Sequence, residues 1–164
     1  MHHNKIICFL VLVCSVIYKC SRATEVNSCS DESYAVLPNI TYSVNSYVCE
    51  STPCICYLGC ATSIDLNFTA PRYLEKMKPQ VLATYAGVTL NYGLNQDDAC
   101  DGFTNTQCPI VKDELVNYKY LLTIPAIFPE VTVTLRFSLI DKEVNKDFVC
   151  FEFDIKVQRD TCPT

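Results

Sequence analysis

Three segments in the second half of the chain alternate almost strictly between apolar and polar residues, and this pattern constrains the fold more than any other feature. They are residues 116–124, 131–139 and 149–157. A period of two places successive side chains on opposite faces of a β-strand, so each segment predicts a strand with one buried face. The charged residues 141–147 between the last two segments predict a hairpin loop.

The first half of the chain predicts shorter strands. Residues 34–48 suit one or two strands, residues 63–69 another, and residues 81–92 a further strand in which Gly87 marks a bulge or a close approach. Residues 71–80 suit either a single helical turn or a plain surface crossover. Prolines cannot donate to a sheet, so the apolar corner at residues 125–129 is expected at a rim. About seven strands without a long helix indicate an all-β, immunoglobulin-like antiparallel sandwich.

The N-terminus has the composition of a secretory signal peptide. Residues 6–18 are almost wholly apolar, and Ser21 and Ala23 are small residues at the positions that a signal peptidase reads. A membrane anchor is the alternative, but the apolar segment is shorter than the ~20 residues that a spanning helix needs. We therefore expect a signal peptide over residues 1–23 and one secreted domain over residues 24–164, with an extracellular or lysosomal destination.

The residues after Ala23 are predominantly acidic, which argues against nucleic-acid binding, and they include two acceptor sites for N-glycosylation. Ten basic and eighteen acidic residues follow Ala23, which leaves a net charge near −8 and no basic cluster. Nucleic-acid binding requires clustered Lys and Arg to neutralise phosphates, so we expect no nucleic-acid partner. Asn39 and Asn67 each begin an Asn-X-Thr acceptor for N-glycosylation, which predicts that both lie on the surface.

Nine cysteines follow residue 23, and in a secreted chain they predict disulfides. Because nine is odd, at least one thiol is free or pairs between molecules. Zinc bound by Cys54, Cys56 and Cys60 is the alternative, but structural zinc usually takes four Cys or His ligands and no histidine follows residue 3. Cys162 lies beyond the last predicted strand, where it could reach Cys56 or Cys60.

Catalysis is not expected. Without a histidine in the mature segment, neither a Ser-His-Asp triad nor a Cys-His pair can form. The chain has only four glycines and no phosphate-binding loop. Asp and Glu lie mostly in loops or on outward strand positions, as on an ordinary solvated face. We expect no cofactor and no metal.

The inward faces of the predicted strands carry many aromatic and aliphatic side chains with no polar partner among them. Two readings remain open at this point. The side chains either fill a solid core, or the two sheets stand apart and enclose an apolar ligand. In the second case the inward residues that would line the site are Phe68, Tyr118, Tyr120, Val133, Leu135, Phe137, Phe151 and Phe153.

The order of the cysteines resembles that of the lipid-recognition (ML) domain family, which includes soluble Niemann–Pick type C sterol carriers and group-two mite allergens. The resemblance runs from Cys29 to Val157. Its motifs are Cys29, Cys49 to Cys54 with Gly59 after it, Cys100 to Cys108 followed by Pro-Ile-Val-Lys, the strand ending at Pro125, and Phe-Val-Cys-Phe at 148–151.

The resemblance implies a sandwich whose sheets hold one lipid. It implies the pairs Cys29–Cys150, Cys49–Cys54 and Cys100–Cys108, and a cavity mouth formed by Tyr92, Ala126 and Phe128. Cys56, Cys60 and Cys162 are outside the family pattern. We favour one pair between Cys162 and one of the other two.

The sequence therefore predicts a secreted, monomeric lipid-binding and transfer protein for a sterol or fatty acid. Its partners would be the lipid and a membrane acceptor or receptor. The alternatives are an extracellular protein that presents microbial or other lipids to a receptor, in innate immunity or chemosensation, and a solid structural domain without a ligand.

Overall fold

The computed structural model describes residues 23–29, 36–93 and 96–163. The predicted signal peptide lies almost entirely outside the described residues. Within these ranges, no helix is both long and apolar enough to cross a membrane.

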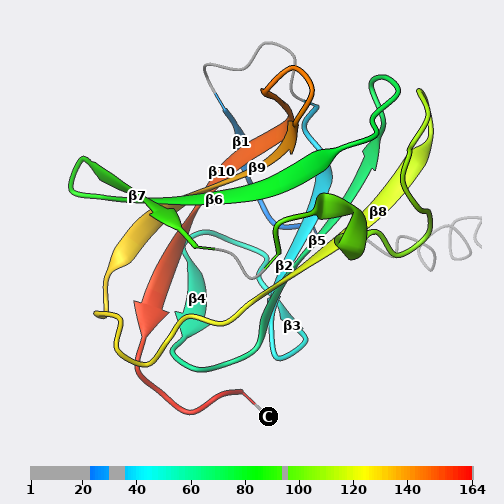
Figure 1. Ribbon diagram of the computed structural model, residues 1–164. Helices are drawn as coiled ribbons and strands as arrows, with labels where there is room; N and C mark the ends of the chain where they lie inside the picture. The colour runs from blue at the N-terminus through cyan, green and yellow to red at the C-terminus, as the bar shows by residue number, and fades with distance from the viewer. Residues whose placement is uncertain (1–22, 30–35, 94–95, 164) are drawn as a thin grey trace, which may run out of the picture.

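The chain folds into two β-sheets packed face to face (Figure 1). The larger sheet has the strand order β1 (Asn27–Ser28), β10 (Lys146–Gln158), β9 (Thr132–Asp141), β6 (Met77–Tyr85) and β7 (Val88–Tyr92), and β4 (Cys54–Tyr57) also pairs with β10. The smaller sheet has the order β3 (Tyr47–Val48), β2 (Asn39–Val44), β5 (Thr62–Thr69) and β8 (Leu115–Leu122). One short 3-10 helix, η1 (Ala99–Gly102), precedes β8. The all-β, immunoglobulin-like sandwich predicted from the sequence is confirmed.

The three alternating segments become the strands β8, β9 and β10. In the register of β9 and β10, Phe137 lies opposite Phe151 and Val133 lies opposite Ile155. Inward positions are buried along most of this pair, while Thr132 and Lys156 on the other face are exposed. The two strands contribute one continuous apolar face to the core because register partners point to the same side of a sheet.

Residues 81–92 form a hairpin rather than a single strand, which corrects the prediction for Gly87. The residues Ala86 and Gly87 form the tight turn between β6 and β7, with φ values of +48° and +80°. Positive φ at both turn positions matches the right-handed twist of the flanking strands, and glycine adopts it without steric cost. In Figure 1 this hairpin reaches away from β2, β5 and β8.

Two further segments, β4 and residues 71–76, test the predictions made from the sequence. The strand β4 was not predicted; it pairs in parallel with β10, with Cys54 opposite Ile155 and Cys56 opposite Val157. Its four residues are too short for alternation to be distinguished from a loop. Residues 71–76 form no helical turn; they cross from β5 in the smaller sheet to β6 in the larger one, as the crossover considered for residues 71–80 predicts.

The described residues form four disulfides, two of which join distant parts of the chain, with sequence separations of 121 and 102, while the other two close short loops. Three are the pairs that the family resemblance implies, Cys29–Cys150, Cys49–Cys54 and Cys100–Cys108. The fourth is Cys60–Cys162, and Cys56 stays a free, buried thiol. Because Cys54 and Cys60 are both oxidised, the zinc site considered for this segment cannot form.

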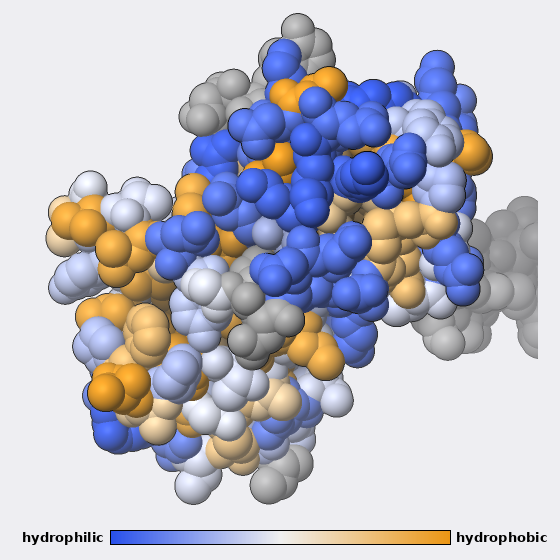
Figure 2. Space-filling model, viewed as in Figure 1, coloured by the Kyte–Doolittle hydropathy of each residue, from blue (hydrophilic) through white to orange (hydrophobic). Residues whose placement is uncertain are grey.

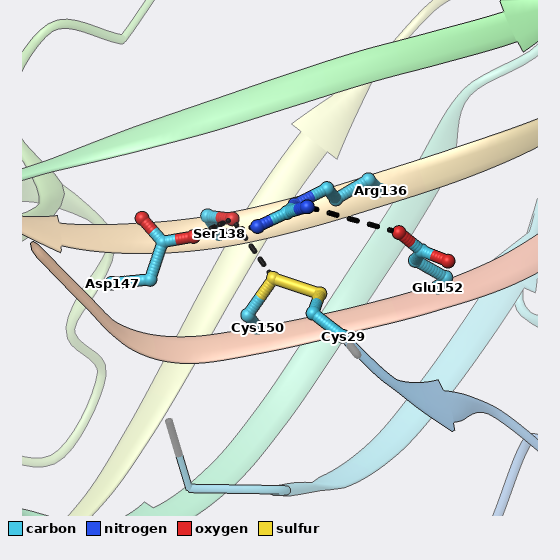
Figure 3. Close-up of a disulfide and its surroundings, with 6 residues drawn as sticks. All are labelled: Cys29, Arg136, Ser138, Asp147, Cys150 and Glu152. Atoms are coloured by element: carbon cyan, nitrogen blue, oxygen red, sulfur yellow. Dashed lines mark hydrogen bonds and ion pairs between the residues drawn. A yellow bond between two sulfur atoms is a disulfide. The ribbon is translucent and has the colours of Figure 1, made fainter. Parts of the chain in front are cut away.

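The disulfide Cys29–Cys150 attaches the N-terminal segment to β10 beside a small polar group (Figure 3). The hydroxyl of Ser138 lies 3.2 Å from the sulfur of Cys150 and donates to Asp147 over 2.9 Å. Arg136 pairs with Asp147 at 3.2 Å and with Glu152 at 4.0 Å. The sulfur is therefore buried between charged side chains on the outer face of the sheet, although alternation alone would leave Cys150 exposed.

Candidate functional site

An apolar cavity of about 500 Å³ lies at one end of the sandwich, enclosed by the β6–β7 hairpin, the strands β9 and β10, and residues 122–131. Ala83 is at the centre of one wall, because its register partners Leu90 and Leu135 also line the cavity. Sixteen residues line the cavity: Val81, Ala83, Tyr85, Ala86, Val88, Leu90, Tyr92, Leu122, Ile124, Phe128, Pro129, Val131, Val133, Leu135, Ile155 and Val157. None is charged, so the cavity suits an apolar ligand.

The rings of Tyr92 and Phe128 meet at the rim of this cavity, with their centroids 6.1 Å apart. Tyr92 is the last residue of β7, and its hydroxyl donates to the backbone oxygen of Thr123 over 3.1 Å. A turn in which the N–H of Phe128 donates to the oxygen of Pro125 positions the second ring. Partial burial raises the pKa of Tyr92, and the Cys56 thiol raises it further. Both rings thus stand between solvent and the apolar interior.

The eleven lipid-contact residues predicted from the sequence fall into three groups. Tyr92, Phe128, Val133 and Leu135 line the cavity. Ala126 does not: it is exposed in the turn between Pro125 and Phe128, because the corner directs this side chain away from the interior. The remaining six, Phe68, Tyr118, Tyr120, Phe137, Phe151 and Phe153, are buried but are not part of the cavity wall.

Those six aromatic residues pack against other rings in the interior beyond the cavity wall, and Phe153 lies directly beside it as the register partner of Leu135. The ring of Phe137 stacks on Phe151 at 5.4 Å and contacts Tyr120 at 5.7 Å and Tyr118 at 6.1 Å. Phe153 contacts Tyr42 at 5.3 Å, and Phe68 contacts Phe148 at 5.8 Å. Burial raises the pKa of Tyr120 to about 12 and raises the pKa of Tyr118 well above its ordinary range. Both readings of the sequence therefore apply, each to its own part of the interior: a solid aromatic core in one and a cavity in the other.

Sequence reasoning missed most of the aliphatic wall of the cavity. The residues not predicted as contacts include Val81, Ala83, Leu90, Ile124, Ile155 and Val157. Ile155 and Val157 lie on the apolar face predicted for residues 149–157, but alternation cannot tell which inward residues meet a gap. Recognising Ala86-Gly87 as a two-residue turn would have found Leu90 and Ala83 as cross-strand neighbours.

A polar groove adjoins the cavity at Tyr92 and Leu122, which border both. Asp97, Asp98 and Asp101 lie along it with Lys119. Asp98 also caps η1 by accepting from the N–H of Cys100 over 2.9 Å. Within the part of the chain that the structure describes, His, Cys, Asp and Glu form no group of three that could hold a metal ion.

The two N-glycosylation acceptors lie side by side on the outer face of the smaller sheet. Asn39 of β2 is the register partner of Asn67 of β5, and both side chains are exposed. This face is on the far side of its sheet from the cavity. Their occupancy by glycans stays a prediction.

A family model, relatives in sequence and a solved structure all relate this chain to the same domain family. The sequence matches the model of the ML domain over residues 23–157. NPC intracellular cholesterol transporter 2 of Bos taurus is 27% identical over 115 residues, which cover 70% of this chain and 75% of the relative. Mite group 2 allergen Lep d 2 of Lepidoglyphus destructor is 30% identical over 92 residues, covering 56% of this chain and 63% of the allergen. The crystal structure of a Niemann-Pick type C2 protein from Japanese carpenter ant has a TM-score of 0.69 at 15% identity, covering 82% of this chain and 99% of that one.

Proposed function

Because the chain belongs to the ML domain family, we propose that it binds one sterol or fatty acid in the cavity between its sheets and transfers it to membranes. The observation that carries this proposal is the uncharged cavity of about 500 Å³ with a two-ring mouth at its rim. Its volume lies within the roughly 300–1,000 Å³ typical of small-molecule sites. The relative from Bos taurus is named as a cholesterol transporter, which supports a sterol as ligand.

The mechanism is transfer of apolar ligand surface out of water, without covalent chemistry. Each square ångström of apolar surface removed from water contributes roughly 25 cal/mol. A sterol of about 28 heavy atoms, at roughly −0.3 kcal/mol per atom, would bind with about −8 kcal/mol, which corresponds to a dissociation constant near 1 μM. Affinity of this order retains a lipid in water and still releases it to a bilayer.

An apolar rim around the cavity provides a route for release. Tyr85, Val88 and Leu90 on the β6–β7 hairpin are exposed at 56%, 61% and 65%, and Ile127 beside the mouth at 89%. Figure 2 shows hydrophobic residues gathered on the hairpin and on the segment facing it. The residues after Ala23 contain no cluster of Lys and Arg, so contact with a bilayer would rest on these apolar side chains rather than on attraction to anionic lipids.

Filling the cavity tests the binding site. Ala83→Trp places an indole between Leu90 and Leu135, and we expect it to weaken binding of a fluorescent sterol and a fluorescent fatty acid at least tenfold, because it occupies the ligand's volume. The melting temperature should stay close to that of the wild type, since the new side chain enters existing space. The measurement is a fluorescence titration of each variant.

Ala126→Trp is the matched control, because Ala126 is exposed and outside the cavity wall. It should bind both probes as the wild type does. Normal binding by Ala83→Trp would place the lipid elsewhere on the protein. A wild type that binds neither probe, and that yields no lipid when purified protein is extracted, would overturn the proposed function.

Replacing Ile127 with Asp tests the transfer step separately from binding. Ile127 is exposed and is not part of the cavity wall, so the affinity for lipid should be unchanged. The rate of sterol transfer between neutral vesicles should fall several-fold, because a charge at the rim opposes contact with hydrocarbon. Val144→Asp, which removes an exposed apolar side chain in the β9–β10 turn, serves as control. Equal transfer rates for both variants would contradict a role of the rim.

A further inference from the structure

The polar groove beside the mouth of the cavity has a volume of about 970 Å³. It lies between the end of β7 and the strand β8, which are edge strands of the two sheets. Tyr92 and Leu122 border both the groove and the cavity. A lipid with its chain in the cavity can place its polar end in this groove, so the chemistry of the groove bears on which polar end is accepted.

Negative charge predominates in the groove. Asp97, Asp98 and Asp101 line it, and none of their carboxylates forms an ion pair in the part of the chain that the structure describes. Among the described lining residues Lys119 is the only cation, and it is already paired with Asp65 at 3.6 Å. The groove thus presents carboxylates that no neighbouring cation neutralises.

Contacts on both sides of this acidic segment hold its backbone beside the mouth. The hydroxyl of Tyr118 donates to Oε1 of Gln96 over 2.8 Å. Asp98 accepts from the N–H of Cys100 over 2.9 Å, and Cys100 is disulfide-bonded to Cys108. In Figure 1 the short helix η1, which follows Asp98, lies beside β8. The backbone that carries the carboxylates is therefore anchored to the edge of the sandwich.

A tyrosine hydroxyl also opens into the groove. Tyr120 is only 3% exposed, and its ring contacts Phe137 on the core side. Burial raises the pKa of Tyr120, and so does the neighbouring Tyr92, which places this hydroxyl near the border of groove and cavity. Within the described residues the hydroxyl has no hydrogen-bond partner, and it is not sealed from solvent, so it faces the groove that the ring lines. A ligand can supply the missing hydrogen bond.

Charge distinguishes the polar ends that a lipid can carry into this groove. A carboxylate would lie among like charges and would be repelled. An ammonium group would be attracted, and its three N–H donors suit carboxylate oxygens and a tyrosine oxygen. Because the three aspartates are exposed to water, the attraction is screened, and we expect a preference of several-fold rather than of orders of magnitude.

We propose that this acidic groove selects the polar end of the bound lipid by its charge, so that the protein binds a single-chain lipid amine more tightly than a carboxylate of the same chain length. The chain occupies the cavity, and the ammonium group lies between Asp97, Asp101 and the hydroxyl of Tyr120. This inference rests on the proposed lipid-binding function and refines it. A neutral sterol remains a ligand, cationic lipids are added as a class, and free fatty acids are disfavoured.

The test compares dodecylammonium with dodecanoate, which have similar chains and opposite charges. Each competes against the neutral fluorophore N-phenyl-1-naphthylamine at neutral pH and low ionic strength, and the ratio of the two affinities is measured for each variant. The wild type should favour dodecylammonium at least fivefold. In the double variant Asp97→Asn with Asp101→Asn this ratio should fall about fivefold, because each exposed charge pair contributes a factor of about two to three. The affinity for the fluorophore itself should stay unchanged.

The matched control is Glu25→Gln with Glu143→Gln, which removes two negative charges from exposed residues outside both the groove and the cavity. Its ratio should equal that of the wild type. An equal fall in both double variants would overturn the inference, because the net charge of the protein rather than the groove would then set the preference.

Tyr120→Phe tests the second contact, because it removes only the hydroxyl. It should weaken dodecylammonium about threefold and leave the fluorophore unaffected, and an unchanged affinity would contradict the placement of the ammonium group at Tyr120. A wild type that binds the two amphiphiles equally, or a ratio unchanged by the aspartate substitutions, overturns this inference and leaves the proposed function standing. A wild type from which neither amphiphile displaces the fluorophore, and that binds no fluorescent sterol, rejects the proposed function as well.

Discussion

Replacing both Cys29 and Cys150 with serine is expected to lower the free energy of unfolding by about 5 kcal/mol. The disulfide closes a loop with a sequence separation of 121 residues, and in the chain-entropy description the stabilisation grows with the logarithm of loop length. A loss of this size is a large fraction of the ~5–15 kcal/mol that stabilises a typical domain. Equilibrium unfolding in urea, followed by tyrosine fluorescence, measures the loss.

The pair Cys100–Cys108 is the internal control, because its sequence separation is only 8. Its removal should cost about 2–3 kcal/mol by the same reasoning. Equal losses for the two double variants would show that the polar contacts around each sulfur, rather than the length of the loop, determine the effect. For Cys150 these contacts include the hydroxyl of Ser138 at 3.2 Å.

Phe137→Ala is expected to destabilise the fold by roughly 3–5 kcal/mol, the range for truncation of a fully buried aromatic residue. Phe137 is 1% exposed and contacts the rings of Phe151, Tyr120 and Tyr118. Truncation leaves a void that the surrounding rings, held by two sheets, cannot fill. Thermal and urea unfolding measure the change.

Phe128→Ala should cost only about 1 kcal/mol, because this ring is 38% exposed at the cavity mouth. A similarly small loss for Phe137→Ala would mean that the aromatic part of the interior is loosely packed in solution. That part would then be open to ligand, and the lipid contacts predicted for Phe137, Phe151 and Phe153 would regain support.

The family and the fold class could be predicted from the sequence, and both are confirmed. Alternation was enough to find β8, β9 and β10 because a strand's period is a local property of about eight residues. Cysteine order was enough for the family because each motif, such as Cys108 followed by Pro109, occupies consecutive positions. The two-residue turn at Ala86-Gly87 could also have been recognised from the sequence, but Gly87 was interpreted as a bulge or a close approach within one strand.

The position of the cavity could not be predicted in the same way. Phe137 and Leu135 are two residues apart on one face of β9, yet one packs against three rings and the other lines the cavity. Whether an inward side chain meets a partner or a gap depends on the separation of the sheets at that point. The residues that border the gap come from the β6–β7 hairpin and from the corner at residues 125–129, which are distant in sequence.

The amino-acid sequence by itself thus determined which residues face inward, that an odd number of cysteines follows residue 23, and to which family the chain belongs. Only the tertiary structure decided that Cys60 rather than Cys56 pairs with Cys162, and that the thiol of Cys56 lies beside the hydroxyl of Thr62 in the interior. The physical reason is that the face of the sheet on which a side chain lies depends on the backbone of its own strand. The side chains that it contacts depend instead on the pairing of strands far apart in the chain. The parallel pairing of β4 with β10 brings Cys56 beside Val157, and the four residues of β4 are too few to show a periodicity that would predict this pairing.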